Sequence, residues 1–375
     1  MTDSGAPVIP DEYGRALASV GATTLAALQL MEGAFRRLHP PDIDGLRERL
    51  APARLRLDGA LDEFRKTPPP GGLEAFHEQM LSGADQGLDA LERFLEPPLP
   101  ASPASGVLAA MGHHARAQET LYPLRLALPP LDQYFAEPAL HPQLPLLDPD
   151  PPDPAGVGLH RAGADDEQAR GGFSLYVPER YTSQREWPLV VALHGGSGNG
   201  RDFLWTWLRE ARSRGFLLLS PTSRGGTWAL DHPASETPAL LQMLEFVCER
   251  WNVDRKRVLL TGLSDGATFT LLAGLAEDAP YTALAPVSGV LHPANFALGN
   301  VQRAAGRRIY LVHGALDWLF PVGLAQATRD ALSQAGAELC YREIADLSHT
   351  YPREENARIL DWFDPAYEPG NGAGR

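Results

Sequence analysis

Apolar residues in the first part of the chain recur at alternating steps of three and four, which places them on one face of a helix. This spacing predicts helices over residues 17–38, 46–64 and 73–95, and a shorter helix over 105–121. Proline and glycine break helices, so the runs at 39–41 and 67–72 separate the predicted helices. We expect residues 1–128 to form a small antiparallel helical bundle.

Proline and acidic residues dominate the next stretch, residues 129–155, most densely at 147–154. Proline lacks the backbone N–H group that helices and sheets use. We therefore expect a semi-extended linker over residues 129–155. The glycine-rich end of the chain, residues 369–375, is expected to be a flexible tail.

Strands and helices alternate between residues 156 and 368. The predicted strands cover residues 158–161, 173–177, 189–193, 216–220, 257–261, 284–288, 309–313 and 340–344. Several of them are unbroken apolar runs, which are typical of parallel strands buried on both faces. The first two should pair across an acidic turn, and helices are expected over 236–251, 267–276 and 322–335. This alternation predicts an α/β domain over 156–368 with a doubly wound, mostly parallel sheet.

Charge and composition narrow the possible partners. The formal net charge of −14 argues against binding to nucleic acid or to an anionic membrane surface, because both need a positive field. No run approaches the roughly 20 apolar residues that span a bilayer, and the N-terminus lacks the pattern of a secretory signal. We expect a cytoplasmic protein without a membrane span. Cys248 and Cys340 make no disulfide framework and are expected to be buried free thiols.

The segment Gly262-Leu263-Ser264-Asp265-Gly266 follows a predicted buried strand and precedes a predicted helix. Glycines two residues before and after a serine allow a sharp turn that presents its hydroxyl at a helix N-terminus. The alternative is an ordinary strand-to-helix turn that contains a serine. The context predicts that Ser264 is a catalytic nucleophile.

The glycine-rich loop 194–200 follows the first long buried strand. Acyl transfer needs backbone amides that face the developing oxyanion. We expect one amide from Asp265 and a second from Gly196, with Ser197 as the alternative to Gly196. A phosphate-binding loop is disfavoured because the Gly-Lys-Ser/Thr ending is missing. His194 is interpreted as a residue that fixes the loop.

An acid and a base follow the last two predicted strands. Asp317 lies in a post-strand loop that ends at a proline, and His349 lies in the next such loop. The predicted catalytic triad is therefore Ser264, Asp317 and His349, in that chain order. Asp346 is an alternative acid, but it lies only three residues from His349. His313, at a strand end, is expected to be structural.

Aromatic residues gather near the predicted site, and Trp228 and Trp318 are the candidates for a substrate pocket. Core packing is the alternative for each of them.

Taken together, the motifs at 193–198, 262–266, 313–321 and 348–351 resemble those of the α/β-hydrolase superfamily. The resemblance is closest to its phospholipase/carboxylesterase branch, a neighbour of dienelactone-hydrolase-like and polyester-depolymerase-like esterases. It covers residues 156–364 and implies an esterase that works through an acyl-enzyme and uses no cofactor and no metal. Dienelactone hydrolases have a cysteine nucleophile where this chain has Ser264, so their substrate is not carried over.

The expected activity is hydrolysis of uncharged, fairly hydrophobic carboxylic esters, including aromatic or polyester-like ones. A thioesterase or a serine peptidase would use the same triad. A non-catalytic hydrolase-fold protein that acts through its helical domain is a further alternative. The resemblance does not cover the helical domain, which could be a cap, a homodimerisation surface or a stabilising appendage.

Overall fold

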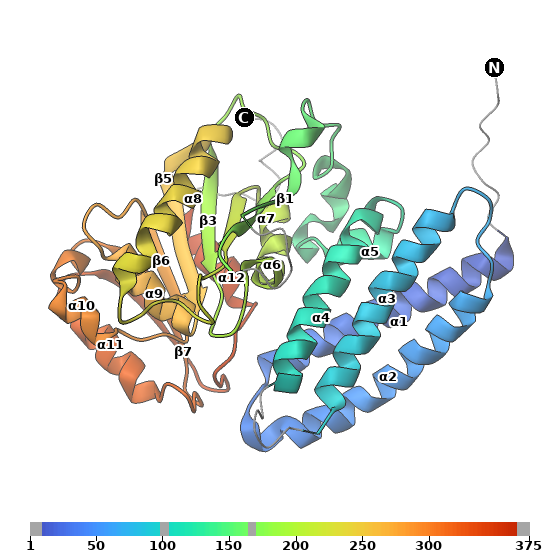
Figure 1. The fold of residues 1–375 in the computed structure, drawn as a ribbon, viewed down its shortest axis with the longest axis horizontal. Coiled ribbons are helices and arrows are strands. Elements are labelled where there is room, and N and C mark those ends of the chain that lie inside the picture. The colour runs from blue at the N-terminus through green and yellow to red at the C-terminus, as the bar shows by residue number, and fades with distance from the viewer. Residues whose placement is uncertain (1–9, 98–104, 164–169, 366–375) are drawn as a thin grey trace. The chain divides into compact units, whose positions relative to one another are not determined.

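The computed structural model describes residues 10–97, 105–163 and 170–365. The chain forms two compact units, coloured blue to teal and green to red in Figure 1. The helical unit contains residues 1–35 and 40–135, and the second unit, called the α/β unit, contains residues 36–39 and 136–375. The predicted tail at 369–375 lies outside the described residues.

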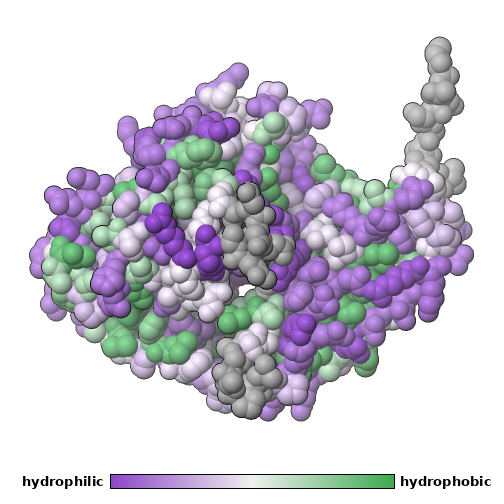
Figure 2. All heavy atoms as spheres, in the orientation of Figure 1, coloured by the Kyte–Doolittle hydropathy of each residue, from purple (hydrophilic) through white to green (hydrophobic). Residues whose placement is uncertain are grey.

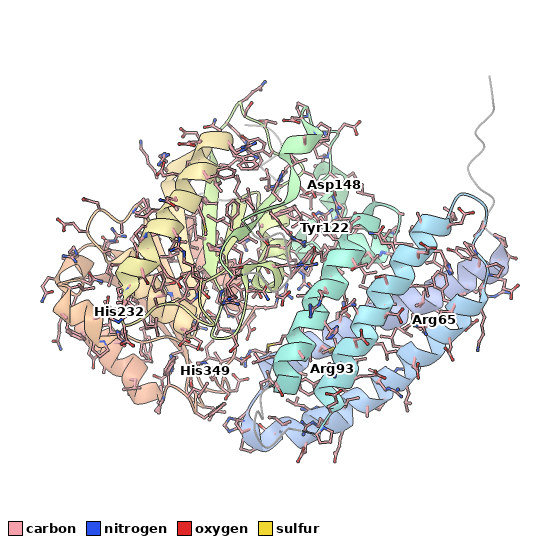
Figure 3. All side chains as sticks on the ribbon, viewed as in Figure 1. Arg65, Arg93, Tyr122, Asp148, His232 and His349 are labelled. Carbon is pink, nitrogen blue, oxygen red and sulfur yellow. The ribbon has the colours of Figure 1, made fainter. Side chains whose placement is uncertain are left out.

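The helical unit follows the predicted pattern closely. Its long helices are α1 (Asp11–Arg36), α2 (Ile43–Lys66), α3 (Glu74–Leu95) and α4 (Ser105–Leu121). Their apolar faces are buried against one another, with Leu28, Met31 and Leu57 fully enclosed. The outer faces carry exposed ion pairs, for example between Asp85 and Arg65, the latter labelled in Figure 3. The amphipathic spacing is thus explained by burial of one face of each helix.

The structure differs from the semi-extended linker expected over 129–155. Residues Pro129–Tyr134 form the short helix α5, and Pro138–Leu146 form a 3-10 helix. Both begin with proline, whose fixed φ suits the first turn of a helix and whose missing N–H is not needed there. Asp148 then pairs with the buried Arg212, and both residues belong to the α/β unit.

One sheet of eight strands forms the described centre of the α/β unit, in the order β1-β2-β4-β3-β5-β6-β7-β8. β1 and β2 run antiparallel to their neighbours and the remaining pairs are parallel. This confirms the predicted doubly wound, mostly parallel sheet. The strands are β1 (Gly158–Ala162), β2 (Phe173–Val177), β3 (Trp187–Leu193), β4 (Leu217–Pro221), β5 (Val253–Leu263), β6 (Ala283–Val287), β7 (Arg308–Gly314) and β8 (Glu338–Ile344).

Helices connect the parallel strands and cover the sheet (Figure 1). They are α6 (Gly200–Phe203), α7 (Leu208–Arg214), α8 (Thr237–Arg250), α9 (Asp265–Gly274), α10 (Pro293–Ala297), α11 (Val322–Gln334) and α12 (Glu355–Phe363). α8, α9 and α11 lie within two residues of their predicted bounds. None of the described helices combines the length and hydrophobicity that a membrane crossing requires.

The core of the α/β unit is built from the central strands. Every residue of β2, β4 and β6 is buried, as their apolar runs predict. Cys248 and Cys340 are free thiols but only half-buried, which corrects the expectation of full burial. Cys340 is half-buried because β8 is the last strand of the sheet and has a neighbour on one side only.

We predict that Asp148→Ala lowers the free energy of unfolding by about 3–5 kcal/mol, because it removes an acceptor from a guanidinium that lies in the protein interior. Urea denaturation of the intact chain measures this. Asp150→Ala, which removes an exposed carboxylate two residues away, should change the free energy by no more than about 0.5 kcal/mol. Equal effects of the two substitutions would contradict a structural role for the Asp148–Arg212 pair.

Candidate active site

Ser264 occupies a strained turn between β5 and α9. Its φ of 56° and ψ of −118° lie in a region that residues other than glycine rarely adopt. A Cβ on Gly262 would lie 2.5 Å from the backbone of Gly266, and one on Gly266 would lie 2.4 Å from the carbonyl oxygen of His194. Both glycines are therefore required by close backbone approach, as the sequence pattern predicts.

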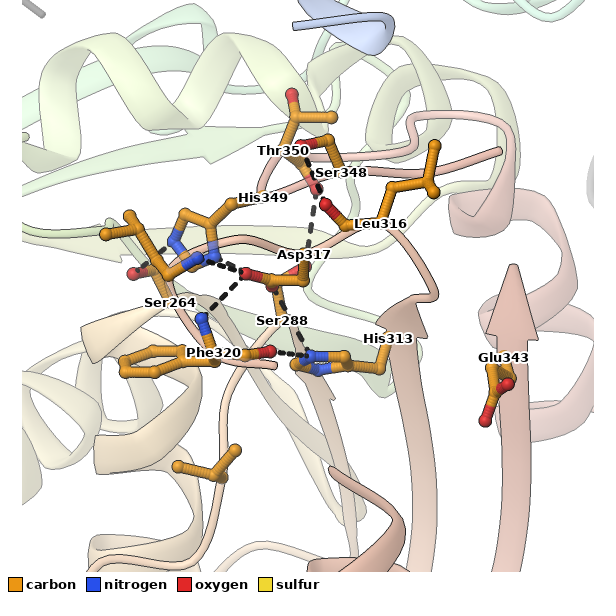
Figure 4. A network of polar contacts seen from close by, with 12 residues as sticks. Ser264, Ser288, His313, Leu316, Asp317, Phe320, Glu343, Ser348, His349 and Thr350 are labelled. Carbon is orange, nitrogen blue, oxygen red and sulfur yellow. Dashed lines mark hydrogen bonds and ion pairs between the residues drawn. The ribbon is translucent and has the colours of Figure 1, made fainter. Parts of the chain in front are cut away.

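The structure brings Ser264, His349 and Asp317 together at the carboxyl ends of β5, β8 and β7 (Figure 4). His349 Nε2 lies 2.8 Å from Ser264 Oγ, and His349 Nδ1 lies 2.8 Å from Asp317 Oδ2. An Nδ1–H that donates to the carboxylate leaves Nε2 free to accept the serine proton. The three side chains thus have the relative positions that nucleophilic acyl transfer requires.

Asp317 is buried and held by several donors. Its Oδ1 accepts hydrogen bonds from the backbone N–H groups of Leu319 (3.0 Å) and Phe320 (2.8 Å). His313 Nε2 lies 3.4 Å from Oδ2 and donates to the carbonyl oxygen of Phe320 at 2.8 Å. Burial lowers the pKa of His313, so the ring is held in its neutral form. As expected for a structural residue, His313 supports the loop that carries the acid.

Asp346, the alternative acid, has a different environment. Its side chain is 77% exposed and pairs with Arg36 at 3.1 Å. The guanidinium of Arg36 lowers the pKa of Asp346. Asp317, rather than Asp346, is hydrogen-bonded to His349.

The loop after β3 lies against the strained turn. A Cβ on Gly195 would lie 3.5 Å from Ser264 Cβ, so this loop borders the serine side chain. The N–H of Ser197 donates to the carbonyl oxygen of Gly226 at 2.8 Å and is thus engaged. Within the described residues, no backbone carbonyl accepts from the N–H groups of Gly196 or Asp265. Both amides are therefore available as donors for an oxyanion.

Part of the chain matches a known protein family. Residues 237–364, which include Ser264, Asp317 and His349, match the protein family described as Phospholipase/Carboxylesterase. Together, this match and the strand order identify the fold as that of the α/β-hydrolases.

Individual relatives of this α/β-hydrolase are distant. A bifunctional acetylxylan esterase/xylanase of Neocallimastix patriciarum is 30% identical over 205 residues, which are 52% of this chain and 29% of that protein. Feruloyl esterase B of Neurospora crassa is 28% identical over 128 residues, which are 31% of this chain and 43% of that protein. The chain thus spans less than half the length of these curated relatives.

Solved structures show partial similarity. The crystal structure of a thermostable esterase matches 55% of this chain and 62% of its own, with 21% identity and a TM-score of 0.47. Acetyl xylan esterase from Aspergillus awamori matches 55% of this chain and 98% of its own, with 18% identity and a TM-score of 0.43.

His194 fixes the loop after β3 in this α/β-hydrolase. Its Nδ1–H donates to the carbonyl oxygen of Gly195 at 2.7 Å, and its Nε2 accepts from the N–H of Ser223 at 3.1 Å. Burial lowers the pKa of His194 to about 4, so the ring is neutral at ordinary pH. A neutral ring with one donor and one acceptor satisfies both bonds at once.

The two candidate pocket tryptophans have different surroundings. Trp228 is 3% exposed, donates its indole N–H to the carbonyl oxygen of His194 at 2.8 Å and stacks on Phe269. Trp318 is 54% exposed, between Leu316 and Leu319, which are about half exposed. Trp228 therefore packs in the core, whereas Trp318 presents its ring on the loop that carries Asp317.

Two further residues near the site were not identified from the sequence. The ring of Phe320 meets His349 edge-on at 5.4 Å between centroids, and Thr227 Oγ1 donates to Asp265 Oδ2 at 2.6 Å. Neither residue belongs to a recognisable sequence motif. Each contact joins two loops that follow different strands, so it appears only in the folded chain. Within the described residues, no group of three or more His, Cys, Asp or Glu side chains is arranged to hold a metal ion.

We predict that the free energy of unfolding falls as the pH is lowered from about 6.5 to about 4. The unfolded chain binds a proton on His194 near its ordinary pKa of 6.5, whereas the folded chain binds it only near 4. This difference corresponds to about 3 kcal/mol for the single group. The stability is fully present above pH 6.5 and is lost as the pH falls through the folded pKa.

Urea denaturation at a series of pH values checks this prediction. His194→Gln keeps an acceptor for the Ser223 amide and cannot titrate in this range. Its unfolding free energy should depend less on pH between 6.5 and 4. An identical pH dependence in the two proteins would show that His194 is not the group responsible.

Proposed function

We propose that this α/β-hydrolase is a serine hydrolase of carboxylic esters that works through an acyl-enzyme. The supporting observation is the position of His349, which lies 2.8 Å from both Ser264 Oγ and Asp317 Oδ2. Binding alone does not require this arrangement. The similarity of the chain to proteins named as acetylxylan and feruloyl esterases supports an ester as substrate.

In the proposed reaction, His349 Nε2 takes the proton of Ser264 as Oγ attacks the ester carbonyl. The amides of Gly196 and Asp265 stabilise the oxyanion, and Asp317 stabilises the imidazolium. His349 then gives the proton to the departing alcohol, which leaves an acyl group on Ser264. A water molecule deprotonated by His349 attacks this acyl group and releases the carboxylic acid.

The proposed substrate is an uncharged ester with a fairly hydrophobic part. Leu316, Trp318 and Leu319 expose apolar surface on either side of Asp317 in the sequence. Phe296, Leu298 and Leu324 add exposed apolar side chains at α10 and α11, where Figure 2 shows green surface. The net charge of −14 disfavours anionic substrates. Aromatic and polyester-like esters fit this description.

Homodimerisation through the helical unit is one of three proposed roles for that unit, beside a cap and a stabilising appendage. Light scattering on the intact chain tests it, since a dimer mass is expected and a monomer mass would contradict it.

Replacing Ser264 by alanine should abolish labelling by an active-site-directed fluorophosphonate and lower ester hydrolysis by at least about 10⁴-fold. Gel fluorescence and a p-nitrophenyl acetate assay measure the two effects. Ser235→Ala, which alters an exposed serine before α8, should leave both unchanged. A folded wild-type chain that is not labelled would favour a non-catalytic protein. Turnover of matched thioesters or peptides, but not of esters, would overturn the ester assignment.

Replacing Trp318 by alanine should lower kcat/KM for an octanoate or benzoate ester about tenfold and have little effect on the acetate ester. The reason is that a pocket wall of this size contributes about 1–3 kcal/mol of discrimination. Leu159→Ala is the control, because Leu159 is an exposed apolar residue on β1, at the opposite end of the sheet from β7. Equal losses for all acyl chains would contradict a role in acyl recognition.

A further inference from the structure

The proposed role of the Asp265 amide as an oxyanion donor does not explain the position of the Asp265 side chain. Its carboxylate oxygen Oδ2 accepts a hydrogen bond from Thr227 Oγ1 at 2.6 Å. The same oxygen lies beside Gly196, because a Cβ on that glycine would come within 2.9 Å of it. The carboxylate thus lies beside Gly196, the other residue whose amide is available to an oxyanion.

A negative charge is unexpected in this place. An oxyanion is stabilised by donors and positive potential, and a nearby carboxylate opposes it. The N-terminus of α9 makes an acid in its first turn favourable, but that effect does not require the side chain to contact the loops after β3 and β4. Across residues 10–97, 105–163 and 170–365, no Arg, Lys or His forms an ion pair with Asp265.

The hydrogen bond between the two side chains determines what they can bind. A carboxylate has only acceptor oxygens, and Thr227 gives its single hydroxyl proton to one of them. The pair therefore offers acceptors to anything that approaches, and Asp265 is half-exposed. A group that binds here must supply hydrogen-bond donors, and a carboxylate or phosphate would be repelled.

We propose that Asp265, positioned by Thr227, is a specificity-determining residue that favours esters with a free hydroxyl group close to the ester bond, such as esters of polyols or sugars. The carboxylate and the threonine oxygen accept hydrogen bonds from these hydroxyl groups. Esters with a carboxylate in the same position are disfavoured. This inference rests on the proposed esterase function and adds the class of alcohol.

The test compares four acetate esters with the same acyl group: n-propyl acetate, glycerol monoacetate, 3-acetoxypropanoate and an aminoalkyl acetate. In the wild type, kcat/KM should be about tenfold higher for glycerol monoacetate than for propyl acetate. It should be about tenfold lower for 3-acetoxypropanoate. Each comparison is a ratio within one protein, so changes in the shared catalytic machinery cancel.

Asp265→Asn removes the charge and keeps the size of the side chain. In this variant, kcat/KM for glycerol monoacetate and for 3-acetoxypropanoate should each differ from that for propyl acetate by no more than about threefold. In Thr227→Val, the glycerol ratio should fall while the discrimination against 3-acetoxypropanoate persists, because the carboxylate is still present. Glu277→Gln removes one exposed negative charge after α9 and should leave all ratios as in the wild type. Circular dichroism of each variant verifies that the protein is folded.

The outcomes separate this inference from the proposed function. If propyl acetate is hydrolysed and the glycerol ratio is the same in wild type and Asp265→Asn, the hydroxyl preference is wrong and the esterase function stands. A strong preference for the aminoalkyl ester that Asp265→Asn abolishes would assign the carboxylate to a cationic substrate and overturn the hydroxyl assignment. Absence of both ester turnover and fluorophosphonate labelling would overturn the proposed function itself.

Discussion

Close backbone contact between two turns is the constraint on which the site depends. The turn at Ser264 is strained, and it persists because β5 and α9 hold both of its ends. Gly266 lies against the backbone of the loop after β3. A Cβ added to Gly266 would be only 2.4 Å from the carbonyl oxygen of His194. The serine and the proposed oxyanion amides are therefore fixed relative to each other by main chain rather than by flexible side chains.

Neutral histidines and one buried acid organise the polar contacts around this constraint. His194 and His313 are both kept neutral by burial, and each joins segments of loop backbone. His349 is the ring that bridges two functional side chains, because it alone among the three lies between Ser264 and Asp317. The site thus separates histidines that hold loops from the histidine that is placed to move a proton.

Local pattern was sufficient to predict most of the fold. The buried strands are continuous apolar runs and the long helices have regular amphipathic spacing, so neither depends on distant partners. The proximity of Ser264, Asp317 and His349 could be predicted because each of them follows a strand end. The linker could not be predicted, since its short helices depend on prolines at helix starts and on the pairing of Asp148 with Arg212, a residue far along the chain. Similarly, the sequence does not show that Trp228 is a core residue and Trp318 an exposed one, because this depends on burial in the folded chain. It also does not show that the Ser197 amide is unavailable to an oxyanion, because this depends on its hydrogen bond to Gly226.

The contact between Gly266 and the β3 loop also bears on how this fold can change during evolution or redesign. Two backbones in direct contact leave no space for a side chain, so neither turn can accept an insertion or a larger residue unless the other shifts with it. The loops after β4 and β7 differ from these turns because they contribute side chains. Thr227 in the first loop hydrogen-bonds to Asp265, and Trp318 in the second exposes apolar surface. New substrate ranges should therefore arise by variation in those two loops, while the serine turn and the glycine loop are inherited together as one unit.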